Sequence, residues 1–314
     1  MGYPLTRDLF YGLWERLEAG FQGQLAKVIA FHHPSWDERR ETLPDIEEFL
    51  TELTANEDLL PTLAPHGRFG PPELRDVKQS LLVAVARWFH DIYAGRKSTP
   101  HENVKTGLLK KIRRTKNAVV ISFNWDYELD AGILGRHPDR PRVLQGYGLE
   151  KGDTPRPYIL KPHGSLNWYL EPLGKHIKAD RSALLWKRSK QSVYCFLRWR
   201  APRTSHDREY VPWIVPPTHM KDFRHPMLGS VWRRCADAIG RADRVFFLGY
   251  SLPIADWHSR YILRCGFHKP QGSLPKVTVV NPDNAAFRRI ESVLGRTCAW
   301  VPKTVSRWLD GIDE

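Results

Sequence analysis

The chain has 314 residues, of which 41% are hydrophobic and 26% charged, a balance that is ordinary for a globular protein. Its net charge of +13 favours acidic partners such as nucleic acid or phosphorylated metabolites, although excess charge also keeps a protein soluble. The four cysteines form no C-x-x-C pair, and neither a secretory signal nor a membrane-spanning apolar run is evident. We therefore expect a cytoplasmic protein without zinc or disulfides.

The first third of the sequence predicts a mainly helical region, residues 1–117. Apolar residues recur there at helical spacing, as in the stripe formed by Leu5, Leu9, Leu13 and Leu17. The expected helices span about 5–25, 44–60, 72–93 and 104–114. We expect this region to be inserted into, or to cover, a sheet formed by the rest of the chain.

From residue 118 onward, strands alternate with helices, a pattern typical of a parallel sheet with helices on both faces. The expected strands span 118–123, 157–160, 213–215, 244–248, 276–280 and 298–301. The expected helices span 126–134, 226–240, 256–266 and 304–309, and a further helix begins at about residue 283. Residues 167–210 give mixed signals and are interpreted as hairpin or loop. The sequence thus predicts an α/β fold in which residues 118–314 form a Rossmann-like doubly wound parallel sheet.

Polar residues follow four of these strands. In a parallel sheet the ligand binds outside the carboxyl ends of the strands, so these residues are expected to converge. A glycine after a strand lets the backbone approach a phosphate, and Ser251 adds a hydroxyl donor beside Gly249. Asn281 or Asp283 could accept a hydrogen bond from a ribose hydroxyl. His163 could act as a general base, since imidazole titrates near neutral pH. Taken singly, Asn124 and Asp126 are more simply interpreted as a helix cap and His163 as a turn residue, and the residues after the other two strands could be ordinary turn residues.

In sequence order, the strand-end motifs resemble those of sirtuins. They read S-F-N-W-D (122–126), K-P-H-G-S-L (161–166), L-G-Y-S-L (248–252) and V-V-N-P-D (279–283). Sirtuins carry T-Q-N-x-D, H-G, G-T-S-L and I-N in the same order. The chain is more similar still to sirtuin-like domains of bacterial anti-phage defence proteins, which share an I-V-P-P-T-x-x-K segment like residues 214–221 and G-Y-S-L-P-x-x-D like residues 249–256. The similarity covers about residues 118–283.

The resemblance implies NAD as substrate and a specific set of site residues. Asn124 and His163 carry over as the catalytic pair, and Asp126 as their neighbour in the nicotinamide pocket, where it could help to orient a water or the nicotinamide amide. Whether His163 acts on water or on a ribose hydroxyl stays open. The residues that the resemblance implies for cofactor binding are Ser122, Gly249, Tyr250, Ser251 and Asn281.

Two departures from sirtuins change the expected function. Deacylating sirtuins hold zinc on four cysteines between the His and G-T-S motifs, whereas this chain has only Cys195 and Cys235 there. We therefore expect an NAD hydrolase in anti-phage defence rather than a protein deacylase. The first strand and glycine-rich phosphate loop of the family have no counterpart in the sequence. We favour a start upstream of Met1 over a degenerate member, and expect a gap in the sheet at that strand.

Three alternative functions remain from the sequence, and an NAD-dependent protein deacylase is one of them. The chain could be a weak or truncated module that senses NAD or ADP-ribose, and it could assemble as a homo-oligomer or with a partner chain of a defence system. Basic residues interleaved with aromatic ones, at 187–190 and 198–200, could bind nucleic acid, although a solvated basic face is the simpler interpretation. Asp256 is interpreted as a helix cap with a structural role.

Overall fold

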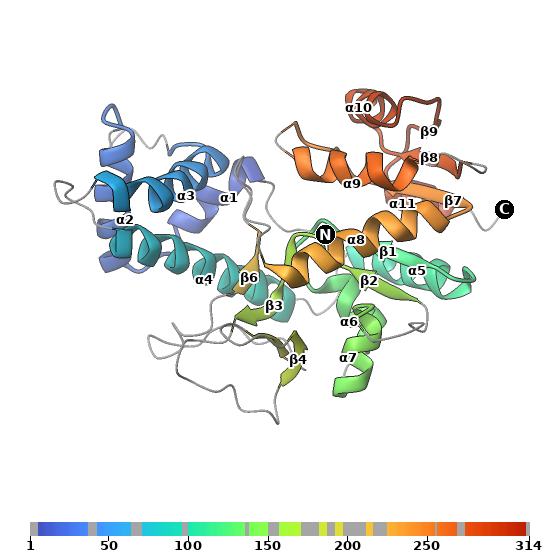
Figure 1. The fold of residues 1–314 in the computed structure, drawn as a ribbon, viewed down its shortest axis with the longest axis horizontal. Coiled ribbons are helices and arrows are strands. Elements are labelled where there is room, and N and C mark those ends of the chain that lie inside the picture. The colour runs from blue at the N-terminus through green and yellow to red at the C-terminus, as the bar shows by residue number, and fades with distance from the viewer. Residues whose placement is uncertain are drawn as a thin grey trace.

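The computed structural model describes twelve segments of the chain. They are residues 6–36, 43–63, 71–95, 100–135, 138–149, 157–170, 182–186, 192–196, 212–215, 225–254, 256–268 and 274–311. These segments form a mixed α/β structure in which α1–α4 gather on one side and the C-terminal elements on the other (Figure 1). The basic segments at 187–190 and 198–200, and residues 216–221 of the I-V-P-P-T-x-x-K segment, lie outside the described residues.

The predicted helical region contains five helices within its described residues. They are α1 (Thr6–Trp14), α2 (Ala19–His32), α3 (Ile46–Leu63), α4 (Pro71–Gly95) and α5 (Pro100–Arg114). The single helix expected over 5–25 is wrong, because the chain turns between Trp14 and Ala19. Gln22 stabilises this turn by donating from Nε2 to the Trp14 carbonyl oxygen at 2.7 Å. α1 then packs on α3 and α4, whereas α5 leaves this group and packs on α6 and α11.

The strands form three separate sheets. Their bounds are β1 (Val119–Ile121), β2 (Tyr158–Leu160), β3 (Gly164–Leu170), β4 (Ser182–Trp186), β5 (Val193–Phe196), β6 (Pro212–Ile214), β7 (Arg244–Leu248), β8 (Lys276–Val280) and β9 (Ala299–Val301). β1 and β2 form a parallel pair, and β7, β8 and β9 form a parallel sheet in that order. The order β4-β5-β3-β6 makes up an antiparallel sheet.

This topology departs from the expected sheet in two ways. The strand predicted at 213–215 belongs to the antiparallel sheet, where β6 pairs with β3. Among the described strands, β1 and β7 share no ladder, so one continuous doubly wound sheet is not seen. The prediction that residues 118–123 form a buried strand is also wrong, since Val119, Val120 and Ile121 are each partly exposed. The physical reason is that, among the described strands, β1 pairs with β2 alone, so its other edge has no neighbouring strand. The partner strand β2 is fully buried.

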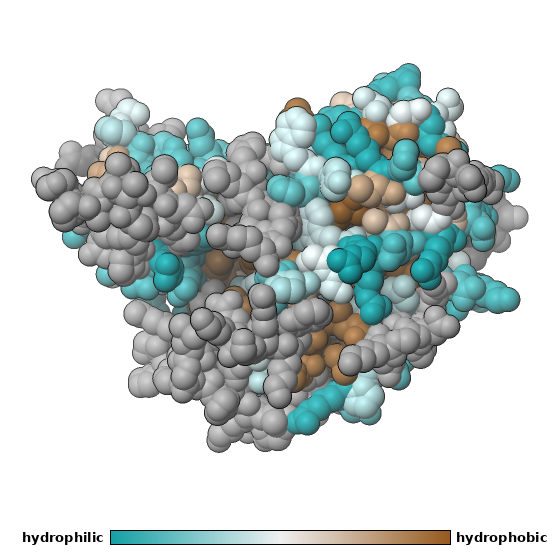
Figure 2. Space-filling model, in the orientation of Figure 1, coloured by the Kyte–Doolittle hydropathy of each residue, from teal (hydrophilic) through white to brown (hydrophobic). Residues whose placement is uncertain are grey.

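The other described helices lie between strands in the chain order, except α11, which follows β9. They are α6 (Glu128–Leu134), α7 (Arg140–Gly146), α8 (Pro226–Arg241), α9 (Trp257–Phe267), α10 (Asn284–Leu294) and α11 (Val305–Asp310). α8 is amphipathic: it buries Met227, Val231 and Cys235, while hydrophilic residues cover its outer face (Figure 2). It packs on α9 and contacts β2. No helix within the described residues is both long and apolar enough to cross a membrane.

Candidate functional site

The predicted base, His163, lies in a tight turn between β2 and β3. The Gly164 amide donates to the Lys161 carbonyl at 3.0 Å, which closes the turn. Two other elements hold the same backbone: the Val215 amide donates to the His163 carbonyl at 2.8 Å, and Trp232 Nε1 on α8 donates to the Pro162 carbonyl at 2.7 Å. The backbone that carries the imidazole is therefore fixed from β6 and from α8 at once.

Steric constraints require glycine at the second position of the H-G motif, Gly164. Gly164 has a φ of +73°, a left-handed conformation that side chains disfavour. A Cβ at this position would lie 2.2 Å from the Trp213 carbonyl oxygen, because β3 and β6 pair at this point. The glycine thus lets the antiparallel sheet approach the turn, and the adjacent imidazole is positioned by that contact.

The His163 ring contacts residues from both parallel sheets. Its Nε2 lies 3.4 Å from Asp256 Oδ1, just before α9, and its ring meets the edge of Phe123 at a centroid distance of 5.3 Å. Phe123, two residues beyond β1, stacks on Tyr250, two residues beyond β7, at 4.5 Å and an interplanar angle of 7°. This aromatic stack joins the carboxyl ends of the two parallel sheets, and His163 lies against it, only 8% exposed.

The interpretation of Asp256 as a helix cap is wrong. Asp256 precedes α9, yet its side chain makes no capping hydrogen bond to the helix backbone. Instead its Oδ2 accepts from the Tyr250 hydroxyl at 2.8 Å and from Ser259 Oγ at 2.6 Å, while Oδ1 faces His163. Burial, and secondarily the Asp256 carboxylate, raises the pKa of Tyr250, so the phenol stays a donor. The carboxylate is 4% exposed and joins the predicted base to the G-Y-S turn.

The other predicted dinucleotide-binding residues shape the turns after β7 and β8. Gly249 is exposed, with a φ of +66° that favours glycine. The Ser251 carbonyl accepts from Arg289 Nε at 3.0 Å. Asn281 donates from Nδ2 to the Tyr250 carbonyl at 3.3 Å and accepts from the Asp283 amide at 2.9 Å. The side chain of Asn281 therefore orders the two turns relative to each other.

The residues after β1 divide between surface and interior. The Ser122 amide continues the β1–β2 ladder by donating to the Leu160 carbonyl at 2.9 Å. Asn124 is exposed, whereas Asp126 is 6% exposed and accepts from the Glu128 amide at 3.0 Å. Burial raises the pKa of Asp126, while Lys161 and this backbone hydrogen bond oppose the shift. Asp126 thus stabilises the start of α6 and lies on the Lys161 side of the turn.

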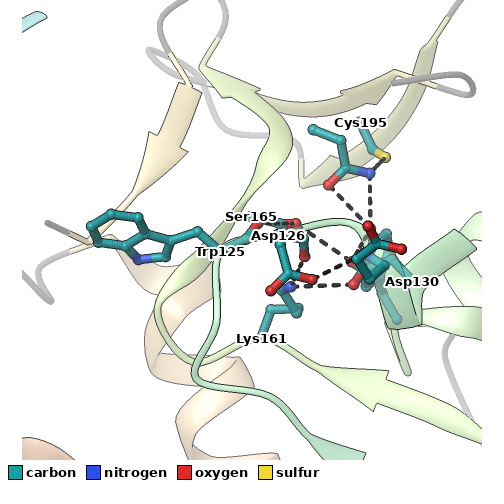
Figure 3. Close-up of polar contacts among 9 residues, drawn as sticks. Trp125, Asp126, Asp130, Lys161, Ser165 and Cys195 are labelled. Atoms are coloured by element: carbon teal, nitrogen blue, oxygen red, sulfur yellow. Dashed lines mark hydrogen bonds and ion pairs between the residues drawn. The ribbon is translucent and has the colours of Figure 1, made fainter. Parts of the chain in front are cut away.

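A buried polar network lies behind the His163 turn (Figure 3). Lys161 Nζ donates to the Asp126 carbonyl at 2.7 Å and forms an ion pair with Asp130 Oδ2 at 3.2 Å. Asp130 Oδ1 in turn accepts from the Tyr147 hydroxyl at 2.7 Å and from Ser165 Oγ at 3.4 Å. The Lys161 and Asp130 side chains are both buried, so the two charges compensate each other inside the protein.

The network extends into the antiparallel sheet. Asn167 Nδ2 on β3 donates to the Tyr147 hydroxyl at 2.8 Å and to Cys195 Sγ on β5 at 3.1 Å. Burial, with the adjacent Asp130 carboxylate, raises the pKa values of Tyr147 and Cys195, so both keep their protons. The network therefore ties α6, α7 and β5 to the strand that follows the His163 turn.

Sequence reasoning missed the residues that hold the site. Lys161 was quoted within K-P-H-G-S-L, but nothing in the local pattern indicates that a lysine is buried. Asp130 carried a readable signal: it lies three and four residues before Ile133 and Leu134, on the buried face of α6, where a charge needs a partner. Its partner is 31 residues away in the chain, which periodicity cannot show.

Comparisons add no family assignment to this geometry. No known family model matches the chain, and no match was found among curated proteins. Across the described residues, no three His, Cys, Asp or Glu side chains gather closely enough to hold a metal ion. The expectation that zinc is not required stays a prediction.

Proposed function

We propose that this chain is a cytoplasmic NAD hydrolase that releases nicotinamide and ADP-ribose, as the resemblance to sirtuin-like defence domains implies. In this reaction the bond between the nicotinamide nitrogen and the ribose C1′ breaks, and its electron pair neutralises the pyridinium. The oxygen of water forms a new bond to C1′, and the proton that water loses passes to His163. Alternatively, His163 first takes the proton of a ribose hydroxyl.

One observation carries the proposal: a buried histidine paired with a carboxylate lies where the carboxyl ends of two parallel sheets meet. Parallel α/β sheets bind nucleotides at this edge. Asn124 and Gly249 are exposed at the same edge, so a ligand that reached them would lie over the His163–Phe123–Tyr250 group. On this proposal the two parallel sheets are parts of one Rossmann-like doubly wound arrangement, joined at their ends by the aromatic stack.

The roles of the remaining residues follow from their placement. The left-handed Gly249 leaves the backbone after β7 open to the pyrophosphate. Asn124, which is exposed, binds the nicotinamide amide or the attacking water. Because Asp126 is buried and bound to the α6 backbone, it holds the Asn124 loop in place rather than touching NAD. Assembly with itself or with a partner chain of a defence system is part of the same proposal.

A second candidate function is the binding of NAD or ADP-ribose without turnover. Asn281 favours it, because both polar ends of this side chain are used to hold the neighbouring turns. A module with ordered turns but fewer groups directed at the ribose would bind the dinucleotide as a sensor does.

Nicotinamide release from NAD, followed by chromatography, tests the two candidates. The variants are His163→Ala and Asn124→Ala. His268→Ala serves as the matched control, since His268 is exposed at the far end of α9. We expect turnover by the unmodified chain and by the control. The loss in the His163 variant should be about 100-fold or more, the usual contribution of a general base.

A parallel thermal-unfolding series with NAD and with ADP-ribose separates binding from chemistry. A ligand at 100 times its Kd stabilises a protein by about 2.7 kcal/mol, which is readily measured. Stabilisation without nicotinamide release would replace the hydrolase proposal by the sensor. Neither stabilisation nor release would overturn both candidates. Turnover that survives His163→Ala would remove His163 from the mechanism.

A further inference from the structure

The His163–Asp256 contact is a close approach of two buried side chains at ion-pair distance. Asp256 Oδ1 lies 3.4 Å from Nε2 of the imidazole, and the contact does not have hydrogen-bond geometry in this structure. On the other side of the carboxylate, Oδ2 accepts two hydroxyl hydrogens at 2.8 and 2.6 Å. Short hydroxyl contacts of this kind are typical of an ionised carboxylate, which can only accept hydrogen bonds.

The two hydroxyl donors come from either side of Asp256 in the chain. Tyr250 belongs to the turn after β7, and Ser259 to the first turn of α9. Tyr250 is itself held by the stack on Phe123. Because Oδ2 is occupied by these donors, the carboxylate cannot rotate without losing two hydrogen bonds in a buried site, and Oδ1 stays directed at the imidazole.

We propose that Asp256 is a positioning residue: when this contact shortens to hydrogen-bond length, the carboxylate accepts the Nε2 proton of His163 and so places the lone pair of the imidazole on Nδ1. The identity of the protonated nitrogen is set by the hydrogen bond that the other nitrogen makes. When Nδ1 takes a proton from water or a ribose hydroxyl, the imidazole becomes a cation, and the carboxylate 3.4 Å away stabilises that charge. Nothing in this role requires Asp256 to touch the substrate.

The inference rests on the proposed function for its effect on rate, but the tautomer can be measured without any turnover. In ¹⁵N-histidine-labelled protein, long-range ¹H–¹⁵N correlations distinguish the two ring nitrogens. The His163 signal is assigned by its loss in His163→Gln. We expect a protonated Nε2 and an unprotonated Nδ1 in the neutral imidazole.

Asp256→Asn provides the decisive variant. An asparagine is nearly isosteric, but its amide can donate to Nε2, which would transfer the ring proton to Nδ1. We expect the tautomer to reverse. If the hydrolase proposal holds, kcat should fall about 100-fold, because the base is then blocked. KM should stay within about threefold, since the contact is not with substrate. A merely structural carboxylate would leave the tautomer unchanged.

The control is Asp139→Asn, at the N-cap of α7, where the aspartate accepts from the Arg142 amide at 2.8 Å and asparagine caps equally well. It should change neither the tautomer nor the rate. A protonated Nδ1 in the unmodified protein would overturn the inference, even if Asp256→Asn fails to fold. An unchanged tautomer in a folded Asp256→Asn protein would overturn it too. Reversal of the tautomer without any NAD turnover would sustain the positioning role while removing the hydrolase proposal.

Discussion

The buried Lys161–Asp130 pair gives the sharpest prediction about stability. In Lys161→Met, a side chain of similar length replaces a lysine that is 1% exposed, and the ammonium is lost. The Asp130 carboxylate, 0% exposed, then keeps only its hydroxyl donors on Tyr147 and Ser165. An uncompensated buried charge of this kind costs about 3–5 kcal/mol. Because globular domains are stable by about 5–15 kcal/mol, this loss is a large fraction of the free energy of unfolding and should be easy to measure.

A double-mutant cycle isolates the ion pair. Asp130→Asn alone removes the carboxylate that lies 3.2 Å from the buried Lys161 ammonium, so a similar loss is expected. The combined variant carries neither charge, and the amide oxygen introduced at position 130 still accepts from Tyr147. Its loss should be about 1–3 kcal/mol, the range for imperfectly satisfied buried polar groups, and well below the sum of the single losses.

The assay is urea unfolding followed by the fluorescence of the twelve tryptophans, with the midpoint and slope fitted together. Arg288→Met is the control, since Arg288 forms an ion pair with Glu291 at 2.9 Å but is 68% exposed. It should change the free energy of unfolding by about 0.5 kcal/mol or less. A loss below about 1 kcal/mol for Lys161→Met, or additivity of the two single losses in the combined variant, would refute the argument.

Other predictions concern backbone, pH and thiols. Gly164→Ala should unfold or severely destabilise the chain, because its Cβ would clash with the Trp213 carbonyl at 2.2 Å. Gly249→Ala should cost only about 1 kcal/mol of backbone strain by urea unfolding. Burial raises the pKa of Asp126 above 3.8, so the ionised carboxylate lowers the stability of the folded protein at neutral pH. Asp126→Asn should therefore stabilise the protein at neutral pH. This gain should vanish below pH 3.8, where the carboxyl is protonated in both states. In a thiol titration, Cys265 should react before unfolding and the three buried cysteines only after it.

Local signals in the sequence located most strands and helices of the C-terminal region. The strands predicted at 244–248 and 276–280 have the observed bounds, since each is a short segment rich in β-branched or aromatic residues. α7 was missed although its start was readable: Asp139 caps it and a proline occupies its first turn. The turn between α1 and α2 left no such mark, because Leu17 continues the apolar stripe while tertiary packing redirects the chain.

The arrangement of strands and the support of the site could not be read from the sequence. Apolar periodicity shows that β6 is a strand, but not that its partner is β3 rather than a parallel neighbour. The strand-end rule predicted that His163 and Tyr250 would come together, which they do through Phe123. Asp256 was misinterpreted because a carboxylate just before a helix normally accepts hydrogen bonds from the helix backbone. Here the carboxylate contacts the side chains of Tyr250, Ser259 and His163 instead.

The His163 turn is held by two kinds of contact that serve different purposes. On one side, Lys161 ties the turn to the buried network through its ion pair with Asp130 and its hydrogen bond to the Asp126 carbonyl. On the other, Asp256 touches the imidazole itself and can alter its protonation without carrying the fold. Gly164 lets β6 press against the turn between them, so the ring has little freedom to relax. Proton transfer needs a rigid imidazole in a defined tautomer, and packing alone does not require one. For this reason the contact with Asp256 bears on function, whereas the larger network bears on stability.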